Sequence, residues 1–161
     1  MNKAYLLTGG NMGDREQNLA MAREWIEADS GKIIHASSIY ETAAWGNTGQ
    51  PAFLNQALEI QTSLNARQLI RHILKAEKKM GRVRKEKYGP RIIDIDILLF
   101  NDEILKTSFL QIPHPEMQNR RFVLIPLAEI APAMIHPLLK KTILQLLDEC
   151  PDKLEVKKVS L

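Results

Sequence analysis

The sequence contains little of several features that define common classes of protein. Its 161 residues include one cysteine, Cys150, which excludes an internal disulfide and any metal site built from several cysteines. No apolar run approaches the roughly 18 residues of a membrane-spanning helix, and the apolar run near the N-terminus is too short for a signal peptide. We therefore expect a cytoplasmic protein that does not bind membranes.

Two further absences concern the organisation of the chain and its possible nucleotide sites. The sequence has no internal repeat, and its eight glycines and eight prolines are scattered instead of forming a linker. It also lacks the GxxxxGK[ST] motif, so a nucleotide site here is not of the P-loop kind. The length fits one domain, which we expect to span residues 1–161.

The composition is that of an ordinary globular protein, with 45% hydrophobic and 25% charged residues. The net charge of +3 favours anionic partners. A nucleotide and a nucleic acid fit this charge equally well, so the charge leaves both open.

Hydrophobic periodicity and turn residues predict alternating strands and helices. The expected strands cover residues 3–8, 32–42, 53–62 and 92–100, and the expected helices run from Asp14 to the Ser30–Gly31 stop, from Asn65 to Gly81, over 121–130 and over 142–149. The order β-α-β-β-α-β predicts an α+β, ferredoxin-like sandwich. Helices would cover one face of an antiparallel sheet, extra helices would follow at the C-terminus, and the other face would stay open for ligands.

Alternation along the third expected strand separates its two faces. Leu54 and Leu58 share the face that suits a helix-covered core, whereas Phe53 and Asn55 share the face that looks toward a cleft.

Two acids on the fourth expected strand form the first chemical signal. Asp94 and Asp96 are two residues apart, so both side chains leave the same face, while the isoleucines between and beside them face the core. Neighbouring carboxylates repel unless a cation lies between them, and Mg²⁺ suits such a pair because it prefers oxygen ligands and shares substrate phosphates. The alternative is a solvated strand face that carries two acids.

A basic loop directly precedes this strand. Its cations are Arg82, Arg84, Lys85, Lys87 and Arg91, against the single acid Glu86. Cations beside a carboxylate pair are what transfer from a metal-bound triphosphate requires. An ordinary solvated charge run is the alternative.

Several blocks of the sequence together resemble one family. The stretch GRVRK at 81–85 and YGPRIIDIDILLF at 88–100 resembles the signature of hydroxymethyldihydropterin pyrophosphokinases. The blocks LTGGNMGD, SSIYET, FLN and PHPEMQNRRFVLIPLAEIAP are similar to further family blocks, in order, between about residues 4 and 137.

This resemblance implies an activity of folate biosynthesis. The chain would transfer a diphosphate from MgATP to the hydroxymethyl group of 6-hydroxymethyl-7,8-dihydropterin and release AMP. It implies ATP as co-substrate, two Mg²⁺ ions, a monomer, and no nucleic-acid partner.

The resemblance also implies a role for individual residues. The catalytic residues would be Arg82, Arg91, Asp94 and Asp96, of which the two aspartates would hold the metal. The ATP-binding residues would be Glu77, Arg82, Arg84, Lys85, Ile97, His114 and Arg120. The pterin-binding residues would be Thr42, Ala43, Ala44, Trp45, Phe53, Asn55, Tyr88 and Phe122.

Four positions depart from the family pattern. Gly10 replaces a small hydroxyl residue, Ala43 stands where proline is common, Phe53 replaces tyrosine, and Tyr88 replaces tryptophan. None of these is an implied metal ligand or catalytic arginine.

Two other functions fit the same expected fold. One is an RNA-binding module, although such modules stack bases on paired aromatics in their central strands, where this chain has Asp94 and Asp96. The other is a nucleotide-sensing domain without catalytic activity, against which the intact acids and arginines argue.

Overall fold

The computed structural model describes residues 1–44, 49–81 and 92–159. Its main sheet is antiparallel throughout and has the order β5-β1-β4-β3-β8, with β2 also paired to β4. The strands are β1 (Asn2–Gly10), β2 (Lys32–Ala36), β3 (Tyr40–Thr42), β4 (Phe53–Thr62), β5 (Asp94–Phe100) and β8 (Val156–Lys158). The mixed α+β, ferredoxin-like architecture is confirmed.

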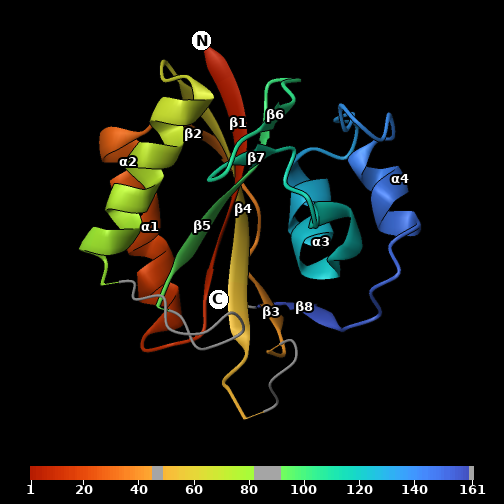
Figure 1. The fold of residues 1–161 in the computed structure, drawn as a ribbon. Helices are drawn as coiled ribbons and strands as arrows, with labels where there is room; N and C mark the ends of the chain where they lie inside the picture. Colours follow the sequence, from red (N-terminus) through yellow and green to blue (C-terminus); the bar gives the residue numbers. More distant parts are fainter. Residues whose placement is uncertain (45–48, 82–91, 160–161) are drawn as a thin grey trace.

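Helices α1 (Arg15–Asp29) and α2 (Ala66–Lys79) cover one face of this sheet (Figure 1). Both begin where the sequence predicts, because a side chain caps each N-terminus: Asp14 accepts from the Gln17 amide at 3.1 Å, and Asn65 forms a capping box with Gln68. Between these helices and the sheet lies one apolar core, which contains Leu54, Leu58 and other apolar residues of the helix-facing strand positions.

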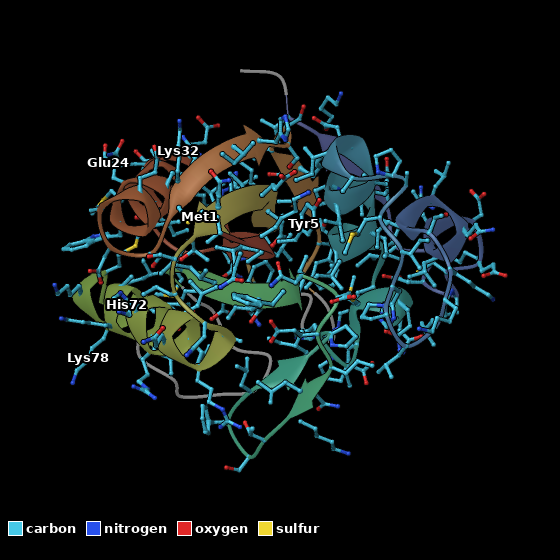
Figure 2. The ribbon with its side chains drawn as sticks, turned by 90° about the horizontal axis from the view of Figure 1, so that it is seen from above. Met1, Tyr5, Glu24, Lys32, His72 and Lys78 are labelled. Atoms are coloured by element: carbon cyan, nitrogen blue, oxygen red, sulfur yellow. The ribbon has the colours of Figure 1, made fainter. Side chains whose placement is uncertain are left out.

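The second face is not open over its whole area, which corrects our expectation. Helix α3 (Arg121–Ile130) lies against it, and α4 (Ile143–Asp148) packs against α3 (Figure 2). The reason is that β1 and β4 place Tyr5, Leu7 and Ala57 on this face, and these apolar groups form a second core with α3 and α4. Of the described residues on this face, Gly9, Asn55 and Asp94 lie beyond this core, toward one end of the sheet.

Two strand boundaries differ from the prediction. Strand β1 continues through Gly9 and Gly10, which pair with Asn55 and Leu54 and do not end the strand. The single strand expected at 32–42 is divided into β2 and β3, because the Ser37 hydroxyl accepts the Ala57 amide at 2.9 Å in place of a regular ladder bond.

The remaining segments complete the two edges of the molecule. Strands β6 (Leu105–Lys106) and β7 (Gln111–Ile112) form a hairpin, followed by the short helix η1 (Met117–Asn119). The C-terminal segment supplies β8 beside β3, a strand that the sequence pattern did not predict. Within residues 1–44, 49–81 and 92–159, none of the helices has the length and apolar character needed to span a bilayer.

Candidate active site

One row of paired residues crosses four strands of the sheet on its second face. Asp94 of β5 pairs with Gly9 of β1, Gly9 pairs with Asn55 of β4, and Asn55 pairs with Tyr40 of β3. Paired residues on neighbouring strands point to the same face. Two strand spacings separate Asp94 from Asn55, which corresponds to roughly 10 Å between their Cα atoms.

The two aspartates lie as the alternation predicts. Asp94 is half-buried and Asp96 is exposed, whereas the isoleucines that alternate with them are buried in the core below α1 and α2. The strand therefore presents two carboxylates to one face and an apolar surface to the other. In the part of the chain that the structure describes, no group of three or more acidic, histidine or cysteine side chains is placed to hold a metal ion.

Glu77 approaches the same strand from α2. Its side chain is buried, and Oε2 accepts a hydrogen bond from the backbone N–H of Ile95 at 2.6 Å. Because β5 is an edge strand, it lacks a strand neighbour on this side, and the carboxylate supplies an acceptor there. Glu77 is thus held within one residue of each aspartate along β5.

The implied pterin residues of β3 and β4 form a compact group. Thr42 pairs with Phe53, and both lie on the face of Asn55, which is 5% exposed. The buried Thr42 hydroxyl has no hydrogen-bond partner among the described residues. Its neighbours Ala43 and Ala44 are exposed and buried, respectively. Thr42 is thus a buried polar residue beside Phe53, on the face that carries Asn55.

Glycine at position 9 makes room for the Asn55 amide. A Cβ atom at Gly9 would lie 2.0 Å from Asn55 Oδ1, far inside any contact distance. The Asn55 amide oxygen therefore lies directly over Gly9 of β1.

Three implied residues come from the segment before and within α3. The Nδ1 atom of His114 accepts from the Glu116 amide at 3.2 Å, so the neutral ring carries its proton on Nε2. Burial, reinforced by the Arg120 guanidinium and opposed by Glu116, lowers the pKa of His114 to about 4. The Arg120 guanidinium lies 6.0 Å from the centre of the Phe122 ring, a cation–π arrangement.

The structure brings some implied residues together and leaves others outside the described part. Ile97 is only 3% exposed and packs in the core, so a ligand could reach no more than its edge. Six positions lie outside the described residues, and their roles stay predictions: Trp45, Arg82, Arg84, Lys85, Tyr88 and Arg91.

The sequence analysis missed a pocket beside α2. It has a volume of about 610 Å³ and is lined by Leu74 of α2 together with residues 107–111 of the β6–β7 turn. Leu74 and Glu77 are one helical turn apart, and the lining residue Gln111 belongs to β7, which contacts β5. No sequence pattern indicates it, because its walls come from segments more than 30 residues apart.

A comparison with protein families identifies residues 5–132 as 7,8-dihydro-6-hydroxymethylpterin-pyrophosphokinase. A 2-amino-4-hydroxy-6-hydroxymethyldihydropteridine pyrophosphokinase of Aquifex aeolicus is 44% identical over 88% of this chain and 88% of its own. The enzyme of the same name from Bacillus subtilis is 46% identical over 80% of this chain and 78% of its own.

Solved structures add a likeness in fold. A crystal structure of Plasmodium falciparum HPPK-DHPS matches 92% of this chain with a TM-score of 0.74 at 20% identity, and this chain spans 43% of that longer chain. The family match covers most of the chain and includes the row of residues from Asp94 to Tyr40. The chain therefore belongs to the family of 7,8-dihydro-6-hydroxymethylpterin-pyrophosphokinases, transferases of folate biosynthesis, as its sequence motifs predict.

Proposed function

We propose that this chain transfers the diphosphate of ATP to the hydroxymethyl group of 6-hydroxymethyl-7,8-dihydropterin, and that the transfer takes place on the second face of the sheet. The observation that carries this location is the row in which Gly9 separates Asp94 from Asn55. The row sets phosphate-binding and ring-binding groups roughly 10 Å apart. We further propose that residues 1–161 act as one domain, as a monomer, in the cytoplasm.

The pterin binds between β3, β4 and α3. The Asn55 amide offers both a donor and an acceptor to the polar edge of a pterin, and the Thr42 hydroxyl offers a further partner. Phe53 of β4 and Phe122 of α3 supply aromatic faces for the flat ring. Further contacts come from Ala43, Ala44, Trp45 and Tyr88.

The phosphates bind at β5. Asp94 and Asp96 fit Mg²⁺, because this ion needs only one or two carboxylates and takes its other oxygen ligands from water and substrate phosphates. We propose two such ions here, which when bound would neutralise and orient the phosphate oxygens. Asp96 is exposed, so a metal ion can reach its carboxylate.

The rest of ATP extends along the outer edge of β5. The pocket beside Leu74 combines apolar side chains such as Phe109 with polar ones such as Thr107, a lining that suits a nucleobase, and Glu77 lies one turn along the same helix. The neutral His114 ring can donate from Nε2, and the Arg120 guanidinium can bind phosphate or ribose oxygens. The remaining ATP contacts are assigned to Ile97, Arg82, Arg84 and Lys85.

The chemistry is an in-line displacement at phosphorus. The hydroxymethyl oxygen loses its proton to solvent and forms a bond to the β-phosphorus, the bond from that phosphorus to the α,β-bridging oxygen breaks, and AMP leaves. Protein groups contribute positioning and charge stabilisation and form no covalent intermediate. Arg82 and Arg91 stabilise the charge that builds on the phosphate oxygens.

A product assay tests this function. The purified chain, supplied with ATP, Mg²⁺ and 6-hydroxymethyl-7,8-dihydropterin, should release AMP and the pterin diphosphate in equal amounts. Release of ADP, or no reaction with the pterin while single-stranded RNA is retained on a filter, would instead favour another activity for this fold.

A further inference from the structure

The connection between β3 and β4 lies at the proposed pterin site, and its two ends meet. Thr42, the last residue of β3, pairs with Phe53, the first residue of β4. The course of the chain next to this pair therefore decides where the Phe53 ring and the Thr42 hydroxyl lie relative to Asn55. Two side chains from outside the connection bind its ends.

Arg15, in the first turn of α1, binds both ends at once. Its Nη1 atom donates to Glu41 Oε2 at 2.8 Å and to the Ala52 carbonyl at 2.9 Å. Glu41 belongs to β3 and Ala52 directly precedes Phe53. One nitrogen atom thus binds both β3, before the connection, and Ala52, at the end of the connection.

Asn11 binds Gln50 and Pro51, the two residues that precede Ala52. It is 1% exposed, and its Nδ2 atom donates to Gln50 Oε1 at 2.9 Å and to the Pro51 carbonyl at 3.1 Å. Asn11 and Arg15 therefore satisfy the consecutive carbonyls of Pro51 and Ala52, which belong to no regular strand pairing.

Asn11 directly follows the last residue of β1, and Arg15 is the first residue of α1, so both belong to the short segment after Gly9. That segment continues β1 beyond the residue over which the Asn55 amide lies. The same short segment thus makes room for Asn55 and holds the chain that carries Phe53. This shared support keeps the two groups in a constant relative position, which a rigid planar substrate requires.

We propose that Asn11 and Arg15 are positioning residues for the pterin, which act through Phe53 and Thr42 and contribute nothing to ATP binding. This inference rests on the proposed function. Because neither side chain is assigned to the phosphates, their loss should separate the affinities for the two substrates.

Titration calorimetry of variants tests the inference. Arg15→Leu and Asn11→Ala should each weaken binding of 6-hydroxymethyl-7,8-dihydropterin about tenfold, equivalent to ~1.4 kcal/mol. Binding of a non-hydrolysable ATP analogue with Mg²⁺ should change less than about twofold in each variant, a bound far below that tenfold step. Arg15→Lys should restore part of the pterin affinity, because one ammonium group can also donate to both Glu41 and Ala52.

Arg23→Leu is the matched control. Arg23 is also a half-buried arginine of α1 that binds β4, through Gln56 Oε1 at 2.7 Å, but Gln56 points to the helix-covered face. This variant should lower the Tm and leave the pterin Kd unchanged.

The results separate the inference from the function on which it rests. If the wild-type chain neither binds the pterin nor releases AMP, the proposed function is wrong. If the wild type is active and both variants bind the pterin as it does, or if pterin and ATP binding weaken equally with a fall in Tm, the positioning role alone is wrong.

Discussion

The Asn55 amide oxygen occupies the space that a side chain at Gly9 would fill. The distance from Asn55 Oδ1 to an added Cβ would be 2.0 Å, and the Leu54 carbonyl would lie only 3.1 Å away. Gly9 does not need its glycine for a left-handed backbone, because its φ lies outside that region. The requirement is therefore for space above β1, and that space belongs to the proposed pterin site.

Gly9→Ala should consequently weaken pterin binding. The added methyl group would displace the Asn55 amide, and a lost or misplaced hydrogen bond to a buried partner costs about 1–3 kcal/mol. The pterin KM should rise by roughly tenfold to a hundredfold, with a smaller change in the ATP KM. Steady-state kinetics with each substrate varied in turn measure both.

Gly31→Ala is the control for this variant. A Cβ at Gly31 would meet the Gln61 carbonyl at 2.5 Å, an equally crowded position far along the sheet from Asn55. It should lower the Tm without raising the pterin KM. A Gly9→Ala enzyme with an unchanged pterin KM would remove Asn55 from the proposed site.

Asp96→Asn should nearly abolish turnover. The substitution keeps the size of the side chain but removes the charge that we assign to Mg²⁺ binding, so AMP release should fall by at least about a hundredfold. The residual activity should require more Mg²⁺ than the wild type does. Asp94→Asn should behave in the same way.

Asp102→Asn is the control for the two aspartate variants. Asp102 is an exposed acid in the turn directly after β5, and its variant should retain full activity and an unchanged Mg²⁺ requirement. Near-normal AMP release by Asp96→Asn at moderate Mg²⁺ would contradict the assignment of the metal ligands.

Tyr40→Phe should loosen the attachment of α3 to the sheet. The Tyr40 hydroxyl donates to Glu129 near the end of α3, and the Ser38 amide donates to the same carboxylate at 2.9 Å. Burial, together with the Glu129 bond and charge, raises the pKa of Tyr40 to about 12. Loss of this bond should cost about 1–2 kcal/mol of unfolding free energy at pH 7.

The pH dependence of the unfolding free energy distinguishes loss of the Tyr40–Glu129 hydrogen bond from loss of packing. Burial acts to raise the pKa of Glu129, but the bonds from Tyr40 and Ser38 outweigh it and leave the pKa below its ordinary value of 4.5. The stabilisation is therefore complete above about pH 4.5 and is lost as the pH falls through the lower folded value. Urea unfolding should show that the wild type and Tyr40→Phe converge in acid; a constant difference would contradict this account.

His114 should make the folded chain less stable in mild acid. Its ordinary pKa is 6.5, and the folded value is about 4, so the unfolded chain binds more protons between these two values. The unfolding free energy should fall as the pH drops from about 6.5 to 4, and His114→Gln should reduce this slope. A ring that titrates near pH 6.5 by NMR in the folded protein would contradict the prediction.

Much of the fold follows from local pattern. The caps Asp14 and Asn65 are short-range features, and the helices begin where these residues predict. Alternation along β5 placed Asp94 and Asp96 on one face, because the side-chain period of a strand is two. The motif blocks then indicated the family, because a motif can be matched without knowing which segments meet in the fold.

Other features depend on contacts between segments far apart in the sequence. The second face was predicted to be open, whereas α3 covers part of it. Strand β1 was predicted to end at residue 8, whereas it continues to Gly10. In each case the partner lies elsewhere in the chain: Leu7 meets α3, and Gly10 pairs with Leu54. The preference of a residue for helix or strand does not depend on such a distant partner, so it could not predict these contacts.

Motifs and local patterns were enough to predict the family, the order of elements and the chemical groups available for phosphate and pterin. Long-range contacts were needed to place Gly9 between Asp94 and Asn55 and to bring Arg15 and Asn11 to the chain before Phe53. The physical reason is that residue types and short spacings set which contacts are possible. Strand register and helix docking, which depend on the whole core, set which of them form.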